Sequence, residues 1–410
     1  MSNFPTEWIF KELGELSKIV DPHPSHRAPP VVYDGIPFIG IGDIKENGNL
    51  ILSKARRVSP DVFEEHSARY KITSNTIGFG RVASVGKVID FQETDLKFAV
   101  SPTMAIIEPN GVNRLYLSYA LRSQFTFEQI NQKLTGTTRS SLGIEQLRSL
   151  NIPLPSEKEQ KKIAEVLSSV DKVIELTEVE IEKLKNLKKG IMQDLLTKGI
   201  GHTKFKDSPI GKIPEEWEVT TLDKVSVKIG DGLHSTPKYV DRSDYYFVNG
   251  NNLKDGSIEI TKSTKCVSED EYLNHRKDLS ENTILMSING TIGNLAYYRG
   301  EPVVLGKSAA YISLESPDYL NYLYYFLDTE SIKKYYDLEL TGSTIKNLSL
   351  KAIRATPIAI PPKEEMEKIN NSITSIDETL SGKVTKLEKV KNMKKGLMQD
   401  LLTGKVRVKV

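Results

Sequence analysis

The stretch Asn186-Leu-Lys-Lys-Gly-Ile-Met-Gln-Asp-Leu-Leu-Thr197 occurs a second time as Asn392-Met-Lys-Lys-Gly-Leu-Met-Gln-Asp-Leu-Leu-Thr403. The second copy follows at an offset of 206 residues, which also relates Asp171 to Asp377. An internal repeat defines the structural unit of a chain, so it is interpreted before any other feature. The sequence therefore consists of two halves built on one plan.

The repeated stretch extends upstream to Glu157, and its apolar residues recur alternately four and three residues apart. This spacing predicts a coiled-coil seam rather than a broad amphipathic face. The predicted seam residues are Ile163, Leu167, Val170, Ile174, Ile181 and Leu184 in the first copy, and Ile369, Ile373, Ile376, Leu380, Leu387 and Val390 in the second. Both seams are interrupted at the same two places, Thr177/Lys383 and Lys188/Lys394. Polar seam residues lower stability but fix the register of two helices.

Helix start and stop signals flank both copies. The first copy begins at a capping box, Ser156-x-x-Glu159, and the copies end near Gly199 and Gly404. Each helix would run roughly 60 Å, whereas a compact intervening domain is about 40 Å across. An antiparallel helix pair with one globular domain at each end is therefore the simplest closure. The alternative, two helices buried separately in their own domains, leaves the matched seam interruptions unexplained.

Charge and composition restrict the possible functions. The chain has 56 basic and 54 acidic residues and a net charge of +2, so bulk charge does not make it a nucleic-acid binder. DNA binding would require locally placed basic residues or a partner's phosphate contacts. No apolar run reaches membrane-spanning length, and the first residues resemble neither a signal nor a transit peptide. The single Cys266 excludes an internal disulfide framework. We expect a cytoplasmic protein without membrane contact.

Outside the long helices, each half mixes short strands with helices. The predicted segments are domain 1 over residues 1–156, a central helix and linker start over 157–203, domain 2 over 204–362, and a C-terminal helix and tail over 363–410. Asn47-Gly48 and Asp255-Gly256 predict tight turns. Helices are predicted around Leu115–Gln132 and Tyr319–Tyr336, and we expect most tyrosines of the second stretch to pack in the core or at its rim.

Three patterns allow two interpretations. Gly78-x-Gly80-x-x-Ala83 resembles a dinucleotide fingerprint, but the second half lacks the spacing and a strand follows, which favours a hairpin. Asp21, His23 and His26 offer metal ligands, but the second half keeps one histidine, which favours polar loop contacts. The segments Thr135–Leu142 and Thr341–Leu348 contain glycine, hydroxyls and a basic residue. They suit a phosphate oxygen and a self-bonded turn equally well.

The whole chain resembles the specificity subunit of a type I restriction–modification enzyme. The residues that carry this resemblance are the helix entry Ile152-Pro-Leu-Pro155 with Glu159, Gln160 and Ile163, the two Lys-Lys-Gly-x-Met-Gln-Asp-Leu-Leu exits, and the opening Ile213-Pro-Glu-Glu-Trp217. The second helix departs from the pattern at its entry, Pro361-Pro-Lys-Glu-Glu-Met366. The implied fold is mixed α/β (α+β), with two globular target-recognition domains joined by two long antiparallel coiled-coil helices.

The resemblance also implies a function. Each domain would bind one half of a split, asymmetric site on double-stranded DNA, and the helices would fix the spacing and dock two modification subunits. Those partners would bind S-adenosylmethionine and methylate adenine, and restriction motor–nuclease subunits would cleave. The residues agree, because the sequence shows no methyltransferase loop, Walker loop or repeated nuclease cluster. We therefore expect no catalytic residue, metal site or cofactor site in this chain.

Matched loop positions supply the candidate DNA-facing residues. They are Ser25, His26, Arg27, Arg81, Thr137, Thr138 and Arg139 in domain 1, and His234, Lys238, Asn251, Asn252, Ser343, Thr344 and Lys346 in domain 2. Arg81 and Asn252 are the candidate base readers, since arginine favours guanine and asparagine favours adenine. Thr138, Arg139, Thr344 and Lys346 are the candidates for phosphate. The rival functions are a coiled-coil scaffold that joins two protein-binding domains without DNA, and an enzyme with chemistry in one half.

Overall fold

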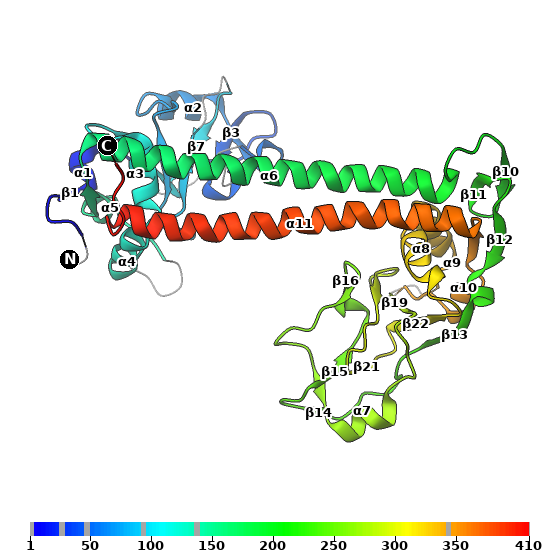
Figure 1. Cartoon of the computed structure of the whole chain (residues 1–410). Coiled ribbons are helices and arrows are strands. Elements are labelled where there is room, and N and C mark those ends of the chain that lie inside the picture. The colour runs from blue at the N-terminus through cyan, green and yellow to red at the C-terminus, as the bar shows by residue number, and fades with distance from the viewer. Residues whose placement is uncertain are drawn as a thin grey trace. The chain divides into compact units, whose positions relative to one another are not determined.

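The computed structural model describes residues 4–23, 29–44, 50–91, 96–134, 140–341 and 346–409. The chain divides into two compact units, Met1–Glu178 with Thr385–Val410, and Val179–Val384. Each unit holds one mixed α/β domain together with parts of the two long helices, α6 (Glu157–Lys198, green) and α11 (Lys363–Leu402, orange to red) (Figure 1).

Domain 1, in the first unit, is built from short elements. They are β1 (Ile9–Glu12), α1 (Leu13–Leu16), β2 (Ser17–Val20), β3 (Ile36–Ile39), η1 (Ile41–Asp43), η2 (Leu52–Lys54), β4 (Arg56–Val58), α2 (Pro60–Ser67), β5 (Ile77–Gly80), β6 (Val88–Asp90), β7 (Ala99–Val100), β8 (Met104–Pro109), α3 (Arg114–Leu121), α4 (Gln124–Lys133), α5 (Ile144–Arg148) and β9 (Asn151–Leu154). The strands form sheets in the orders β2-β8-β5-β6, β4-β3-β7 and β1-β9.

Domain 2, in the second unit, follows the same plan with a few additions. Its elements are β10 (Phe205–Ser208), β11 (Gly211–Pro214), β12 (Glu218–Thr221), η3 (Leu222–Val225), β13 (Ser226–Asp231), β14 (Tyr239–Val240), β15 (Tyr245–Val248), η4 (Gly250–Asn252), β16 (Leu253–Lys254), β17 (Ser257–Ile258), β18 (Cys266–Val267), α7 (Glu269–His275), β19 (Thr283–Ser287), β20 (Leu295–Tyr297), β21 (Val303–Leu305), β22 (Ala309–Leu314), α8 (Asp318–Leu327), α9 (Glu330–Glu339), α10 (Leu350–Arg354) and β23 (Pro357–Ile360).

The sheet topology repeats with the sequence. The order β13-β22-β19-β20 matches β2-β8-β5-β6, β18-β15-β21 matches β4-β3-β7, and β12-β23 matches β1-β9. Among the strands described in both domains, the pairs are antiparallel except for β3 with β7 and β15 with β21, which are parallel. The repeat seen in the helices therefore extends through both domains, even where the residues differ.

Local signals place the ends of the long helices. The Ser156 hydroxyl accepts a hydrogen bond from the Glu159 amide at 3.3 Å, which confirms the predicted N-cap of α6. A glycine follows each long helix. Gly199 comes directly after α6 and has φ +66°, and Gly404 is separated from the end of α11 by Thr403 and has φ +71°. This left-handed conformation favours glycine, and it ends both helices as predicted.

In the first unit, the start of α6 packs antiparallel to the end of α11. Asp171 pairs with Lys394 at 2.5 Å, and Glu178 pairs with Lys391 at 2.8 Å. Residue numbers therefore rise along one helix as they fall along the other. Domain 1 packs on this helix pair, because its core cluster includes Trp8 together with residues of α6 and α11 such as Leu167 and Leu401.

In the second unit, the end of α6 packs antiparallel to the start of α11. Glu180 pairs with Lys383 at 2.6 Å, and Lys188 pairs with Asp377 at 2.5 Å. The core cluster of domain 2 includes Trp217 together with Leu196 of α6 and Ile369 and Ile373 of α11.

The residues of the predicted seam are buried or half-buried between the two helices. Ile163, Leu167, Val170, Ile181, Ile369, Ile373 and Leu387 are buried, and Ile174, Leu184, Ile376, Leu380 and Val390 are half-buried. Three of the four polar interruptions form ion pairs between the helices, and the fourth, Thr177, is buried with its hydroxyl donating to the Val173 carbonyl. The alternative of separately buried helices is wrong.

The structure also tests the predictions for the glycine-containing turns and for the tyrosine-rich helices. The segment from Gly78 to Ala83 is a hairpin between β5 and β6, not a nucleotide loop. The Asp255-Gly256 turn joins β16 to β17, with φ values of +47° and +77°, whereas Asn47-Gly48 lies outside the described residues. Tyr322, Tyr325 and Tyr336 are buried and Tyr319, Tyr324 and Tyr335 half-buried, as predicted. Among the helices described, none is both long enough and apolar enough to cross a membrane.

Candidate nucleic-acid interface

Several backbone segments of domain 2 meet at one edge of its two main sheets. β15 and β21 are parallel, so their last residues, Val248 and Leu305, lie at the same edge. A Cβ atom at Gly232 would lie 2.2 Å from the Leu305 carbonyl oxygen, and one at Gly250 would lie 2.7 Å from the Ser287 Cβ atom. Glycine is required at both positions, because the segments that follow β13, β15, β19 and β21 converge closely there.

A small hydrogen-bond network holds this convergence. The Ser308 hydroxyl accepts from the Gly250 amide and donates to the Asn249 side-chain oxygen, each at 2.9 Å. The Ser308 carbonyl accepts from the Ile288 amide, also at 2.9 Å. Ser308 therefore joins the loops after β15, β19 and β21 into one surface.

Predicted residues of domain 2 lie around this surface. The His234 side chain is 72% exposed, and its Nε2 lies 2.8 Å from Asp231 Oδ2 at the end of β13. Asn251 is exposed in η4, next to Gly250. Lys238 is exposed just before β14, and no contact with another described residue brings it to the same surface.

The surface contains two polar residues that the sequence argument missed. Lys307 is exposed between Gly306 and Ser308, and its carbonyl accepts from the Asn289 side chain at 3.3 Å. The sequence does contain a pattern that indicates Lys307, because Gly306-Lys307-Ser308 directly follows the apolar strand β21. Loops at the carboxyl ends of parallel strands are a common place for ligand-binding side chains.

The glycine- and hydroxyl-containing segment near the end of domain 2 approaches the same surface. Thr341 and Asn347 exchange backbone hydrogen bonds of 3.0 and 2.9 Å, which close the segment at its base. The carbonyl of Lys346 accepts from the Gly290 amide at 3.4 Å, and the Lys346 side chain is exposed. Ser343 and Thr344 lie outside the described residues.

Asn252, a candidate base reader, has its side-chain amide engaged within the domain. Its Oδ1 accepts from the Asn249 amide at 3.0 Å, and its Nδ2 donates to the Glu259 carbonyl at 3.1 Å. Asp43 makes the matching bond in domain 1, where its carboxylate accepts from the Gly40 amide at 2.8 Å. The position thus stabilises the η1 and η4 turns, and reading a base would require Asn252 to exchange these bonds.

Arg81, the other candidate base reader, joins two loops of domain 1. Its Nη1 lies 2.9 Å from Asp21 Oδ2, and its Nε donates to the Leu142 carbonyl at 3.1 Å. Only 12% of the Arg81 side chain is exposed. Its guanidinium therefore positions the loop segments that flank the other predicted residues, and base reading by Arg81 would require this ion pair to open.

The remaining domain 1 candidates, Ser25, His26, Arg27, Thr137, Thr138 and Arg139, lie outside the described residues. The segment after Arg139 is described, and it contacts the β5–β6 turn as in domain 2. The Ala83 amide donates to the Ser140 carbonyl at 3.3 Å, and Val82 pairs with Ser141. The two domains therefore place the same loops beside the same hairpin.

The residues considered as metal ligands have other contacts. Asp21 accepts from the backbone amide of His23 at 3.2 Å as well as from Arg81. The His23 ring is buried against His66 and Phe38, with centroid distances of 4.8 and 6.2 Å. Among the described residues, no three His, Cys, Asp or Glu side chains form a group that could hold a metal ion.

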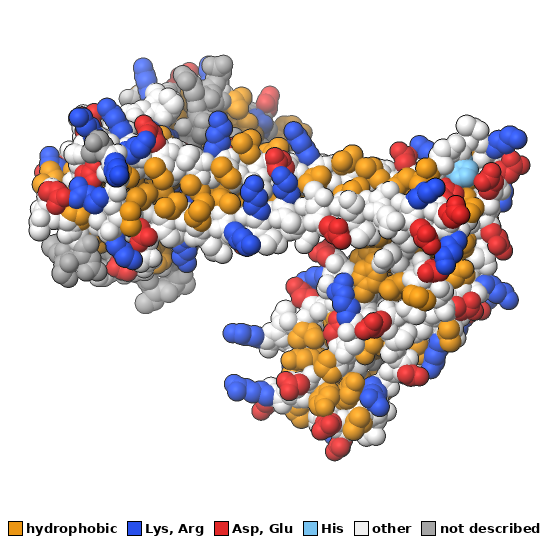
Figure 2. Space-filling view, viewed as in Figure 1, with side chains coloured by type: hydrophobic (Ala, Val, Ile, Leu, Met, Phe, Trp, Pro, Cys, Tyr) orange, Lys and Arg blue, Asp and Glu red, His pale blue; other side chains and the backbone are white. Residues whose placement is uncertain are grey.

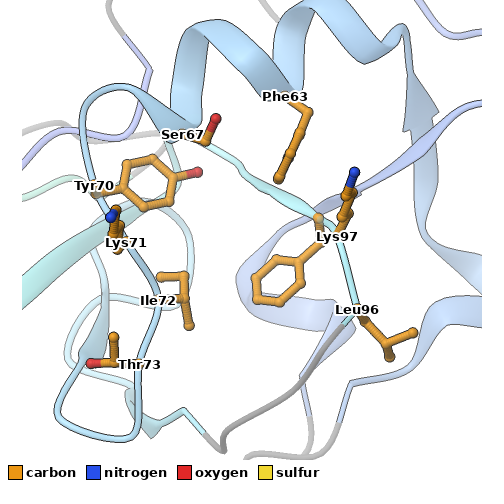
Figure 3. Close-up of a pocket in the computed structure, with 9 residues that line it drawn as sticks. Phe63, Ser67, Tyr70, Lys71, Ile72, Thr73, Leu96 and Lys97 are labelled. Atoms are coloured by element: carbon orange, nitrogen blue, oxygen red, sulfur yellow. The ribbon is translucent and has the colours of Figure 1, made fainter.

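Domain 1 also has a pocket of about 280 Å³. Figure 3 shows the ring of Phe63 and the side chain of Ile72 facing its interior, with Lys71 and Lys97 among the lining residues. The lining segments come from α2 and from the residues that precede β5 and β7, whereas Arg81 follows β5. Arg81, the domain 1 candidate among the described residues, does not line it.

Comparison with known proteins gives these features a context. The family described as "Type I restriction modification DNA specificity domain" matches residues 5–186 and again residues 214–392. The chain belongs to this type I specificity family. The double match coincides with the repeat, so the protein has two target-recognition domains.

Relatives and solved structures agree with this membership. The type I restriction enzyme MjaVIII specificity subunit of Methanocaldococcus jannaschii is 31% identical over 328 residues, which covers 76% of this chain and 75% of the relative. A structure from a study of complex assembly and conformational transition of the type I restriction–modification system has a TM-score of 0.60 at 18% identity, and covers 99% of this chain and 100% of that chain. The S subunit from M. genitalium gives a TM-score of 0.55 at 16% identity, covering 98% and 97%. These two structures support the fold alone.

Proposed function

We propose that this chain recognises a bipartite, asymmetric site on double-stranded DNA, with one half bound by each domain. The observation that supports this most is that both domains share one topology and one loop arrangement but present different side chains. Gly42 and Ala83 of domain 1 correspond to Asn251 and Gly290 of domain 2 in matched turns. Two different half-sites require two different binding surfaces on a common scaffold.

The chemistry of the domain 2 surface suits DNA. Lys307 and Lys346 are exposed donors for phosphate. Asn251 is an exposed amide able to pair with a base edge. These donors are few, and on the face shown in Figure 2 acidic side chains are interspersed with basic ones. We therefore propose that partner subunits supply much of the phosphate contact.

The partners follow from family membership. The paired helices are proposed to fix the spacing of the half-sites and to dock two modification subunits. Those subunits would bind S-adenosylmethionine and methylate adenine, and restriction motor–nuclease subunits would cleave. This chain would then act without catalytic chemistry of its own, as a cytoplasmic recognition subunit.

Co-expression with a modification subunit, followed by gel-shift measurements on DNA libraries over a range of salt, tests the proposal. We expect a complex that selects a split sequence and binds more weakly as salt rises. A scaffold would form complexes without sequence preference, and an enzyme would turn over a substrate alone. Either result would contradict the proposal.

A further inference from the structure

Domain 1 contacts the long helices through a closed set of three polar side chains. The Tyr119 hydroxyl on α3 donates to Asp171 Oδ2 on α6 at 2.7 Å. Asp171 Oδ1 lies 2.5 Å from Lys394 Nζ on α11. The Lys394 ammonium also lies 5.8 Å from the centroid of the Tyr119 ring, within range of a cation–π contact. Three separate elements therefore meet at one point.

The repeat produces the same triad in the second unit. Tyr325 on α8 donates to Asp377 Oδ2 on α11 at 2.6 Å, and Asp377 Oδ1 lies 2.5 Å from Lys188 Nζ on α6. The Lys188 ammonium lies 5.1 Å from the Tyr325 ring centroid. Each residue of this triad lies 206 positions from its counterpart, but α6 and α11 exchange roles.

The triads occupy positions where apolar packing would be expected. Lys188 and Lys394 interrupt the seam, and each side chain is 24% exposed. Burial, aided by the hydrogen bond to Asp171, raises the pKa of the Tyr119 phenol, which therefore remains a hydrogen-bond donor. Directional polar contacts at a seam specify one arrangement, whereas apolar side chains tolerate several. The triads are therefore suited to orientation more than to stability.

The residues around the two triads differ between the domains, whereas the triads themselves are the same. In domain 1, Asp90 accepts from Ser118 at 2.7 Å and pairs with Arg122 at 2.6 Å. In domain 2, the corresponding location holds Tyr297 stacked on Tyr324, with ring centroids 4.2 Å apart. A charged network and an aromatic stack thus support the same contact to the helices.

We infer that Tyr119–Asp171–Lys394 and Tyr325–Asp377–Lys188 are positioning residues that orient each recognition domain on the helix pair, so that each triad controls one half of the DNA site. This inference rests on the proposed function. It also makes a crosswise assignment, because Lys394 follows domain 2 in the sequence but acts on domain 1, and Lys188 follows domain 1 but acts on domain 2.

Lys394→Met and Lys188→Met test the assignment, since methionine fills a seam position without the ion pair. Hydrogen–deuterium exchange of the full chain is measured first, without DNA. Lys394→Met is expected to accelerate exchange in α3 but not in α8, and Lys188→Met the reverse. Both variants should melt close to the temperature of the unaltered chain. The apolar seam residue offsets the lost ion pair, and Asp171 and Asp377 keep their tyrosine hydrogen bonds.

Binding to single-base variants of the recognised site is measured next, with the full chain in complex with its modification subunits. Each variant should lose about tenfold in its preference for the recognised site over single-base variants of that site. Lys394→Met and Lys188→Met should lose this preference in different halves of the site. Lys185→Met is the matched control, because Lys185 pairs within α6 with Glu182 at 3.0 Å and is 55% exposed. It should change neither exchange nor discrimination.

Three outcomes would overturn the inference. The first is unchanged hydrogen–deuterium exchange in both α3 and α8. The second is loss of discrimination in the same half of the DNA site for both variants. The third is a lower melting temperature together with equally weaker binding to all DNA sequences, which is what purely structural residues would give. If the unaltered complex shows no sequence preference, the proposed function fails instead. If the unaltered complex is selective and both variants match it, only the inference fails.

Discussion

Asp171 on α6 and Lys394 on α11 lie 2.5 Å apart, at the place where the sequence interrupts an otherwise apolar seam. The same bond joins Asp377 to Lys188 in the second unit, again at 2.5 Å. Three of the four polar interruptions of the seam are thus specific ion pairs between the helices. A lysine left unpaired at such a position would lower stability, whereas a paired one selects a register.

Glu365 at the start of α11 is predicted to be a strong stability determinant. Its side chain is 12% exposed and accepts from the Trp217 indole at 3.0 Å and the Ile200 amide at 2.8 Å. Glu365→Leu leaves these donors without an acceptor, so we expect a loss of about 3 kcal/mol in the free energy of unfolding. Urea denaturation measures it.

The neighbouring Glu364 provides the control, because it is exposed in the same helical turn. Glu364→Leu should change the free energy of unfolding by less than about 0.5 kcal/mol. Equal losses for the two substitutions would show that the hydrogen bonds of Glu365 do not carry the effect.

Gly190 and Gly396 are predicted to reduce the stability of the long helices. They lie at matched positions in helix interiors, and a Cβ atom at either would meet nothing within 4 Å. Substitution by alanine should therefore raise the free energy of unfolding by about 1 kcal/mol at each site. Gly199→Ala is the opposite case, since Gly199 has φ +66° and a Cβ there would lie 2.4 Å from Glu365 Oε1. Thermal unfolding that ranks all three alike would contradict this account.

Domain 1 is predicted to lose stability in mild acid. His66 is 1% exposed, its Nδ1 has no partner within the described structure, and burial next to His23 lowers its pKa. The unfolded chain then binds a proton at higher pH than the folded one, so stability falls as pH drops below about 6.5. The slope is at most about 1.4 kcal/mol per pH unit.

His66→Phe should flatten this dependence, because the buried ring no longer titrates. Thermal unfolding at about pH 7.5 and about pH 5.5 provides the measurement. His234→Gln is the control, since that side chain is 72% exposed, and it should leave the acid sensitivity intact. An unchanged slope in His66→Phe would exclude His66 as the cause.

Lys307 and Lys346 are predicted to contact phosphate rather than bases. Alanine at either position should weaken binding to all sequences alike and reduce the salt slope by about 0.9. Fluorescence anisotropy over a salt series measures both quantities. Lys333→Ala serves as control, because Lys333 pairs with Asp328 on the surface of α9 at 2.7 Å. A loss confined to one base position would instead identify a base reader.

Features set by local periodicity were predictable from the sequence. The helices α6 and α11, their caps, their seam and the turn at Asp255-Gly256 depend on residues a few positions apart. Lys188 and Lys394 were predicted as polar seam positions, but their partners on the opposite helix and the contacts of those partners to Tyr119 and Tyr325 were not.

Features that require distant residues to meet were not predictable. Arg81 was expected to face DNA, and its ion pair with Asp21 spans 60 residues. Lys307 and Asn289 were missed because their surface exists only where β15 pairs with β21. Hydrogen bonds such as that from the Asn249 amide to the Asn252 side-chain oxygen were not predictable either, since an asparagine that stabilises a turn and one that reads a base are the same letter in a sequence.

The central claim is that two recognition domains each bind one half of a split DNA site. Methylome sequencing of cells that express this chain with its modification subunits tests it most directly. We expect methylated adenines within an asymmetric site of two short sequences separated by a fixed unspecified spacer, and substitutions at Asn251 that alter one half alone. Methylation at a contiguous site, or changes in both halves from that single residue, would contradict the claim.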